Sequence, residues 1–334
     1  MDNTVAQLWH RGQIIDGEVG IEVEVEGEKL PDNIPKSSAL HPRYWTTTRD
    51  GSLRGEAFEY VLTAPVSREH VKPALSQLYS RLDKCVVHDS GRAGIHVHIN
   101  VRELTLTQMF TFVLLYMVFE KVLVRFCGEE REGNLFCLRV TDAEYLAMLL
   151  QKSISRQQFN LLSTDDLRYA SINLTALRKY GSLEFRAMRS PVSQEILQQW
   201  VTTLLAIKDS AARLQDPEEL ILGISQDGGE DFARMHLGPT MDFLGVCDWR
   251  KEVLDGLRVI QPIVKTLSAA SKTVKVKILE PEIAMEDIPW DRGLPEGFNR
   301  HVIRGDAVQA RVVPNLGLPH VAMVTFQWIH RARG

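Results

Sequence analysis

Four segments of the chain alternate apolar and polar residues, and acids, histidines and arginines occupy the polar positions. In GIHVHIN, residues 94–100, His96 and His98 alternate with isoleucine and valine. Successive side chains of a β-strand point to opposite faces of the sheet, so this pattern predicts a strand with one apolar and one polar face. Such strands are typical of an antiparallel sheet that is packed on one side and open on the other.

The other three segments repeat this pattern at well separated places in the sequence. They are VGIEVEVEG at residues 19–27, EAFEYVLTAP at 56–65 and GSLEFRAMR at 181–189. Their polar faces are predicted to present Glu22, Glu24 and Glu26 from the first, Glu59 from the second, and Glu184, Arg186 and Met188 from the third.

Longer segments between the strands have apolar residues at helical spacing. They predict helices over Ser67 to about Lys84, Leu106 to Phe126, Asp142 to about Lys152, a long segment after Pro191, and about Trp249 to Leu267. The acidic, Gly-rich residues 225–245 predict a loop, and KTVKVKIL and HVAMVTFQWI near the C-terminus predict strands. Together these elements predict an α+β fold, with helices backing one face of an antiparallel sheet.

Composition narrows the classes of partner. The chain has 334 residues, 44% of them hydrophobic and 25% charged, which is ordinary for a globular protein. Its net charge of -4 gives no general attraction to nucleic acid or to an anionic membrane. The most apolar run, MFTFVLLYMVF at 109–119, is shorter than the roughly 20 residues of a membrane span and predicts a buried helix. Four cysteines without CxxC spacing, and an N-terminus without a signal-peptide pattern, favour the cytoplasm.

The polar strand faces suit a metal site, although each segment alone has a simpler interpretation. Alone, the alternating glutamates of residues 22–26 fit the solvated face of a strand, and His96 with His98 fit a surface or buried histidine pair. Glu184 beside Arg186 alone fits a weak ion pair. Four such segments in one predicted sheet favour a shared site instead. Carboxylates and an imidazole from several strands suit Mg²⁺ or Mn²⁺, and arginines beside them suit phosphate. The residues therefore point to phosphoryl chemistry.

The ordered set of motifs resembles the amidoligase family, relatives of glutamine synthetase and glutamate-cysteine ligase that join a carboxylate to an amine using ATP. The resemblance runs from about Gly20 to Pro191. It rests on G-I-E-V-E at 20–24, D-G-S-L at 50–53, E-Y-V-L-T-A-P at 59–65, G-I-H-V-H at 94–98, R-Y-A-S-I-N-L at 168–174 and L-E-F-R at 183–186. One departure is Thr63-Ala64-Pro65, where the family usually has Ser-Pro.

The resemblance implies a fold like the catalytic domain of glutamine synthetase, with the sheet curved into a funnel or partial barrel. ATP is expected at one end, the acceptor carboxylate at the other, and divalent metals between them. The implied Mg²⁺ or Mn²⁺ ligands are Glu22, Glu24, Glu59, His96 and Glu184. His98 is implied as a nucleotide contact, and Arg168 and Arg186 as the arginines that hold the transferred phosphoryl group. Glu56 competes with Glu59 for the acidic role.

These features predict an ATP-dependent carboxylate–amine ligase that works through an acyl phosphate. Asp50 is expected to take a proton from the amine, and the segment around Gly228 and Gly229 to act as a lid. The alternatives are a guanidino-kinase-like phosphotransferase, a metal-dependent hydrolase, and a non-catalytic binding module on the same fold.

The resemblance leaves the substrates open among amino acids, peptides, proteins and cell-wall peptides. It suggests a bacterial or bacteriophage source, and it leaves the oligomeric state open because related synthetases range from monomers to large rings. A catalytic domain over residues 1–245 is expected, with a C-terminal extension over 246–334 packed on it.

Overall fold

The computed structural model describes residues 1–36, 42–49, 51–131, 138–139, 144–163, 170–245, 247–272, 308–313 and 323–328. The chain divides into two compact units, Met1–Val276 and Lys277–Gly334. In the second unit, β8 (Val308–Val313) and β9 (Met323–Trp328) form an antiparallel pair. β9 lies within the predicted strand HVAMVTFQWI, whereas the predicted strand KTVKVKIL begins at Lys272 and otherwise lies outside the described residues.

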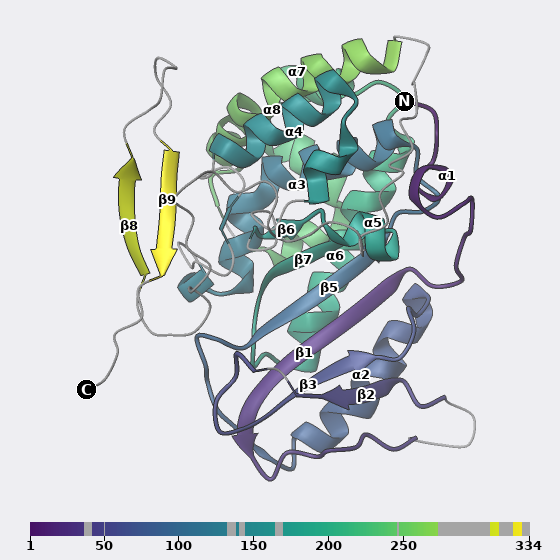
Figure 1. The fold of residues 1–334 in the computed structure, drawn as a ribbon. Coiled ribbons are helices and arrows are strands. Elements are labelled where there is room, and N and C mark those ends of the chain that lie inside the picture. Colours follow the sequence, from purple (N-terminus) through teal and green to yellow (C-terminus); the bar gives the residue numbers. More distant parts are fainter. Residues whose placement is uncertain are drawn as a thin grey trace. The chain divides into compact units, whose positions relative to one another are not determined.

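An antiparallel sheet forms the centre of the first unit, and it is curved without closing into a barrel (Figure 1). The strand order is β2 (Trp45–Thr48), β3 (Glu56–Leu62), β1 (Val19–Glu28), β5 (Gly94–Asn100), β7 (Ser182–Arg189) and β6 (Ile172–Asn173), with β4 (Val86–Val87) paired to the end of β1. The four predicted strands are β1, β3, β5 and β7, and they occupy the centre of this order. The predicted class is confirmed as a mixed fold with a curved antiparallel sheet and helices.

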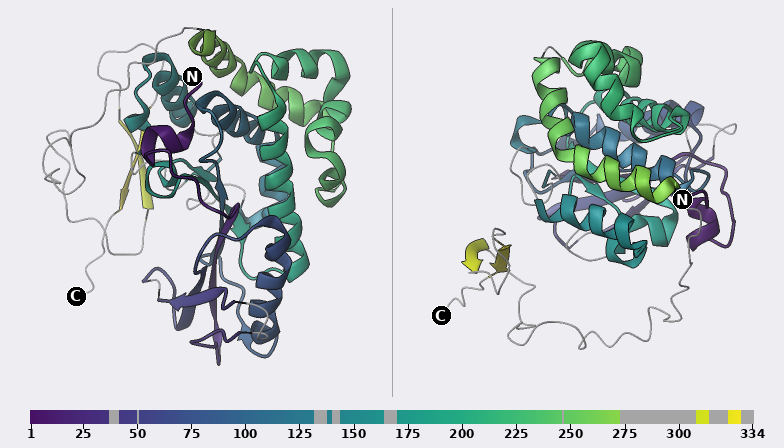
Figure 2. Two further views of the ribbon diagram at one scale, coloured as in Figure 1. Left: turned by 90° about the vertical axis from the view of Figure 1, so that its right-hand side faces the viewer. Right: turned by 90° about the horizontal axis from the view of Figure 1, so that it is seen from above.

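The apolar face of the sheet packs against helices, as the alternation predicts. Ile21, Val97 and Phe185 are all buried. The Phe185 ring lies 5.5 Å from Phe112 and 5.0 Å from Tyr116, ring centroid to ring centroid, and both partners are in α3 (Leu106–Cys127). α2 (Arg68–Leu82) and α6 (Gln194–Arg213) extend the helical layer along the same side (Figure 2). The polar face is left free of this layer.

Helix α3 is the centre of the helical core. It is buried along most of its length and packs against α6, against the β7 strand, and against α8 (Trp249–Lys272). α4 (Glu144–Arg156) and α7 (Glu219–Leu237) pack on α8 in turn. The expected helices are therefore present. None of the helices in the described parts of the chain is long and apolar enough to cross a membrane.

The described part of the first unit also contains short elements: α1 (Val5–Trp9), η1 (Glu129–Arg131), η2 (Phe159–Ser163), α5 (Ala176–Tyr180) and η4 (Gly238–Phe243). The compact unit that contains the sheet extends through α8 to Val276. The expected functional boundary after residue 245 stays a prediction.

The prediction of a loop over residues 225–245 is wrong, because most of this segment is helical. α7 continues through it with a kink at Gly228, whose φ is 75°, and η4 follows. Phe232, Ala233 and Leu237 are buried at helical spacing. Gly229 is packed so tightly that a Cβ there would lie 2.2 Å from Cα of Arg250 at the start of α8. These glycines allow a kink and a close helix contact, and the lid role expected of this segment stays a prediction.

Gly256 tests the packing of α8 on α3. A Cβ at this position would lie 2.4 Å from the carbonyl oxygen of Val118, which is backbone and cannot move aside easily. We expect Gly256→Ala to lower the free energy of unfolding by about 1–3 kcal/mol, the usual cost of overpacking. Urea denaturation provides the measurement. In the control Gly223→Ala, the new methyl meets only the Phe232 ring at 3.4 Å, so this variant should keep its stability or gain from the higher helix propensity of alanine. Equal denaturation midpoints for the two variants would contradict the packing.

The buried side chain of His236 should make the protein less stable in acid. Its side chain is buried beside Phe232 and forms a 2.7 Å hydrogen bond between Nδ1 and Oγ of Ser210. Burial, followed by the charge of Arg213, lowers the pKa of His236 to about 4. The unfolded chain binds this proton near pH 6.5 and the folded chain only near pH 4, so unfolding takes up a proton within this window.

Stability should therefore fall with decreasing pH by up to about 1.4 kcal/mol per pH unit from this residue. We expect His236→Asn, whose amide can bond Ser210 without titrating, to flatten the slope of unfolding free energy between pH 6.5 and 4. Parallel slopes for the two proteins would show that His236 is charged in the fold or exposed.

Candidate active site

The antiparallel register brings the polar residues of the four central strands side by side. The opposed pairs are Glu22 with His96, Glu24 with Glu59, and His98 with Glu184. Residues directly opposite one another in an antiparallel pair point to the same face and lie close together. Residues from four distant stretches of the sequence thus form one continuous polar surface on the face opposite the helices.

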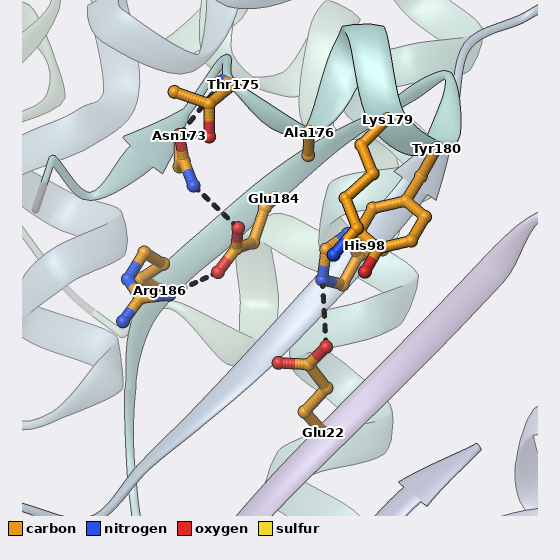
Figure 3. Close-up of a pocket in the computed structure, with 9 residues that line it drawn as sticks. All are labelled: Glu22, His98, Asn173, Thr175, Ala176, Lys179, Tyr180, Glu184 and Arg186. Carbon is orange, nitrogen blue, oxygen red and sulfur yellow. Dashed lines mark hydrogen bonds and ion pairs between the residues drawn. The ribbon is translucent and has the colours of Figure 1, made fainter. Parts of the chain in front are cut away.

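Glu22 lies between two imidazoles at the middle of this surface. Its Oε2 atom is 3.2 Å from Nδ1 of His96, and its Oε1 atom is 3.5 Å from Nε2 of His98, as Figure 3 shows for the second contact. Burial by itself would raise the pKa of Glu22, but hydrogen bonds from His96 and His98 outweigh burial and lower the pKa. Glu22 is therefore an anion at neutral pH.

Glu184 is held on two sides. Its Oε2 atom accepts a 2.7 Å hydrogen bond from Nδ2 of Asn173, and its Oε1 atom pairs with the guanidinium of Arg186 (Figure 3). Asn173 is itself oriented, because its Oδ1 atom accepts hydrogen bonds from the backbone N–H and the hydroxyl of Thr175. Burial raises the pKa of Glu184, but the charge of Arg186, followed by the electrostatic interactions with His98 and His96, lowers it further than burial raises it. The carboxylate therefore stays charged although it is buried.

Glu24 and Glu59 form the acidic end of the surface. Glu24 is buried, accepts a 2.7 Å hydrogen bond from the backbone N–H of Gly94, and has Oε1 3.9 Å from Nε2 of His96. Glu59 accepts a 2.8 Å hydrogen bond from the hydroxyl of Thr48. Burial, together with the negative charges of Glu22 and Glu24, raises the pKa of Glu59. A cation bound here would relieve this repulsion.

The structure separates Glu56 from Glu59. Glu56 lies opposite Gly27 at the far end of β1, and its carboxylate accepts a hydrogen bond from the backbone N–H of Leu30. Glu59 instead offers an oxygen to the same small space as Glu22 and His96. The geometry thus places Glu59 with the candidate ligands and gives Glu56 a contact with the loop that follows β1.

Among the described residues, two groups of candidate metal ligands share Glu22. In each group one donor atom per residue lies within 4.8 Å of the others, and the groups are Glu22, Glu59 and His96, and Glu22, His98 and Glu184. Carboxylate oxygens with an imidazole nitrogen are a donor set that fits Mg²⁺ or Mn²⁺. The second group includes His98, which the resemblance assigned to the nucleotide.

A cavity of about 330 Å³ opens beside the second group. Figure 3 shows Glu22, His98, Asn173, Glu184 and Arg186 on the strand side, and the residues of α5 and its preceding turn on the other. The opposite wall consists of Thr175, Ala176, Lys179 and Tyr180. Sequence reasoning missed these residues because α5 shows no alternation that would assign them to a face. It also missed Asn173 of β6, although this residue stands inside the motif R-Y-A-S-I-N-L.

Lys179 and Tyr180 make this second wall both charged and aromatic. The Lys179 ammonium lies 4.6 Å from the centroid of the Tyr180 ring, and that ring meets His98 edge to face at 5.7 Å. The hydrogen bond with Tyr180, followed by the charges of Tyr180, Glu22 and Glu184, raises the pKa of Lys179. The cavity therefore has carboxylates on one wall and a protonated lysine on the other.

Seven of the predicted site residues lie together on the polar face: Glu22, Glu24, Glu59, His96, His98, Glu184 and Arg186. Arg168 and Asp50 lie outside the described residues. Met188 was expected in phase with Arg186, and this is wrong. A bulge between the Ile95 and Val97 pairings shifts the register of β7, so Met188 pairs with Ile95 on the apolar face and is buried.

Comparison with known proteins relates part of the chain to a protein family. Residues 61–208 match a family described as putative amidoligase enzyme. The resemblance to the amidoligases is confirmed over this segment. A search of curated proteins found no match. The matched segment includes β5, β6 and β7, and therefore His96, His98, Glu184 and Arg186, whereas β1 with Glu22 and Glu24 precedes it.

Metal binding by Glu22 can be compared with a matched acid on the same strand. Glu26 lies two pairs along β1 from Glu24 and accepts a hydrogen bond from the backbone N–H of Arg54, outside both ligand groups. We expect Glu22→Gln to weaken Mn²⁺ binding at least about tenfold, since it removes the ligand that both groups share, and Glu26→Gln to leave binding unchanged. Calorimetric titration with Mn²⁺ measures both. Equal loss in the two variants would indicate unspecific attraction to the acidic surface.

Proposed function

We propose that the protein is an ATP-dependent carboxylate–amine ligase, which forms an amide or peptide-type bond through an acyl phosphate. One observation carries the proposal: Glu22 is shared by two groups of metal-ligand type, and Arg186 lies beside them in a segment that matches the amidoligase family. A guanidinium next to a divalent-metal site is suited to the phosphates of a nucleotide. The donor acids, the arginine and the family match all support the same chemistry.

The residues of the polar face have distinct roles in this proposal. Glu22, Glu24, Glu59, His96 and Glu184 hold Mg²⁺ or Mn²⁺, with His98 placed either to join them or to contact the nucleotide. When bound, the metal neutralises phosphate charge that would otherwise repel the incoming carboxylate. Arg186 contacts the transferred phosphoryl group, and its pairing with Glu184 keeps it oriented toward the cavity. Arg168 is proposed as a second arginine for the same group.

The proposed reaction has two steps, formation of an acyl phosphate and then formation of the amide. An oxygen of the substrate carboxylate attacks the γ-phosphorus of ATP, and the bond from that phosphorus to the ADP oxygen breaks. The amine nitrogen then attacks the acyl carbon, the carbon–oxygen bond to phosphate breaks, and inorganic phosphate leaves. The amine must lose a proton to become a nucleophile, and Asp50 is proposed to accept it. Amino acids, peptides, proteins and cell-wall peptides all remain candidate substrates.

Turnover of ATP with Mg²⁺ or Mn²⁺ tests the proposal against pooled carboxylates and amines. We expect ADP, inorganic phosphate and a new amide mass to appear only when both substrates are present. Glu184→Gln should reduce this turnover by at least about 10²-fold, because it weakens both metal binding and the orientation of Arg186. Glu26→Gln is the matched control and should retain it.

The other outcomes separate the alternatives. Phosphate that stays on the product would mean a kinase, and phosphate release without any amine would mean a hydrolase. Failure of the metal–nucleotide complex to bind would contradict catalysis by ATP altogether.

A further inference from the structure

The strand that carries Arg186 has one extra residue next to His96. On β5 a single residue, His96, lies between the Ile95 and Val97 pairings, whereas on β7 two residues, Arg186 and Ala187, lie between the matching partners. This is a β-bulge, which leaves a residue out of the regular ladder and redirects the side chains around it. The bulge separates Arg186, which faces the cavity, from Met188, which is buried on the helix side.

Arg131 provides donors for the carbonyl groups of this bulge. It is the last residue of η1, and only 3% of it is exposed. Its Nε donates a 2.9 Å hydrogen bond to the carbonyl oxygen of Ala187, and its Nη2 donates a 2.9 Å hydrogen bond to that of Arg186. Because the guanidinium is a rigid planar fork, the two contacts together fix how far apart the two carbonyl groups lie.

The backbone of Arg186 is therefore held from two directions. Its N–H donates a 2.8 Å hydrogen bond to the carbonyl oxygen of Ser171, while its C=O accepts from Arg131. Its side chain pairs with Glu184, and Nη1 lies 3.4 Å from Nδ1 of His96. Its Nε atom is buried and has no hydrogen-bond partner among the residues that the structure describes. The direction of this side chain thus depends on the backbone position at the bulge.

The guanidinium of Arg131 also lies next to Gly94, at the start of β5. A Cβ on Gly94 would lie 3.3 Å from Nη2 of Arg131 and 3.6 Å from Oε2 of Glu24. The backbone N–H of Gly94 donates to that Glu24 oxygen. Arg131 therefore packs where the bulge, the β5 strand and the acidic end of the polar face meet.

We propose that Arg131 is a positioning residue that directs Arg186 into the cavity by clamping the bulge of β7. The consequence for catalysis rests on the proposed function, in which Arg186 contacts the phosphoryl group. The structural part, that Arg131 sets the environment of Arg186, does not depend on any activity.

Variants of Arg131 distinguish the effect of its positive charge from the effect of its two hydrogen-bond donors. Arg131→Lys keeps the positive charge but cannot donate to two carbonyl groups as a rigid fork. Arg131→Met removes both donors. We expect kcat of the ligase to fall about tenfold or more in Arg131→Lys and about 10²-fold in Arg131→Met, with KM for ATP changed less than about threefold, because a displaced catalytic group impairs the reaction more than binding.

A double-variant cycle tests whether the effect passes through Arg186. In an Arg186→Lys background, Arg131→Met should lower kcat less than about twofold further, because the group that it positions is already absent. The control is Lys208→Met, which removes another buried cation, one that pairs with Glu103 and Glu18. This control should keep kcat per folded molecule, whatever it loses in stability. Additive losses in the double variant would overturn the catalytic part of the proposal.

Side-chain NMR of protein labelled with ¹⁵N-arginine reads the structural part without any substrate. The Nε–H signal of Arg186, assigned by its loss in Arg186→Lys, should move in Arg131→Lys and stay in place in Lys208→Met. An unmoved Arg186 signal in a folded Arg131→Lys protein would overturn the proposal. If the native protein turns over no ATP, the proposed function fails, and the NMR result alone then decides whether Arg131 positions Arg186.

Discussion

The pairing of β1 with β5 is the constraint on which the candidate site depends. It sets Glu22 opposite His96 and Gly20 opposite His98, and the adjoining pair sets His98 opposite Glu184. Because side chains alternate along a strand, a slip of one residue would turn every acid and histidine of β1 or β5 toward the helices. The buried residues on the other face, such as Ile21 and Val97, oppose this slip since it would expose them. The apolar core therefore holds the charged site in register.

Buried charge on the polar face is tolerated because it is paired. Glu184 is only 7% exposed, and its carboxylate is paired with both Arg186 and Asn173. Glu22 has two imidazoles as partners, whereas Glu59 lies near two other carboxylates, and its pKa is raised by burial and by their charges. Burying a charge costs free energy that only hydrogen bonds and opposite charges offset. A bound divalent cation would offset the uncompensated negative charge around Glu59.

Alternation in the sequence was sufficient to predict the four central strands, the apolar face and the residues that share the polar face. It could not predict the bulge at Arg186, because one inserted residue changes the phase without changing the local pattern, and Met188 was misplaced for this reason. The helical structure within residues 225–243 was missed because Gly228 and Gly229 suggest a loop, whereas here they allow a kink and a close contact with α8. Lys179 and Tyr180 were missed because only the fold brings α5 to the cavity.

The most direct test of the central claim follows the oxygen of the substrate carboxylate. A pool of amino acids and peptides labelled with ¹⁸O in their carboxyl groups is incubated in ordinary water with the protein, ATP, Mg²⁺ and an amine pool, and the inorganic phosphate is analysed by ³¹P NMR. An acyl phosphate transfers one carboxyl oxygen to phosphate, so we predict ¹⁸O in the phosphate that is released with ADP. Phosphate that forms without the label would show that water, and not a carboxylate, attacks ATP.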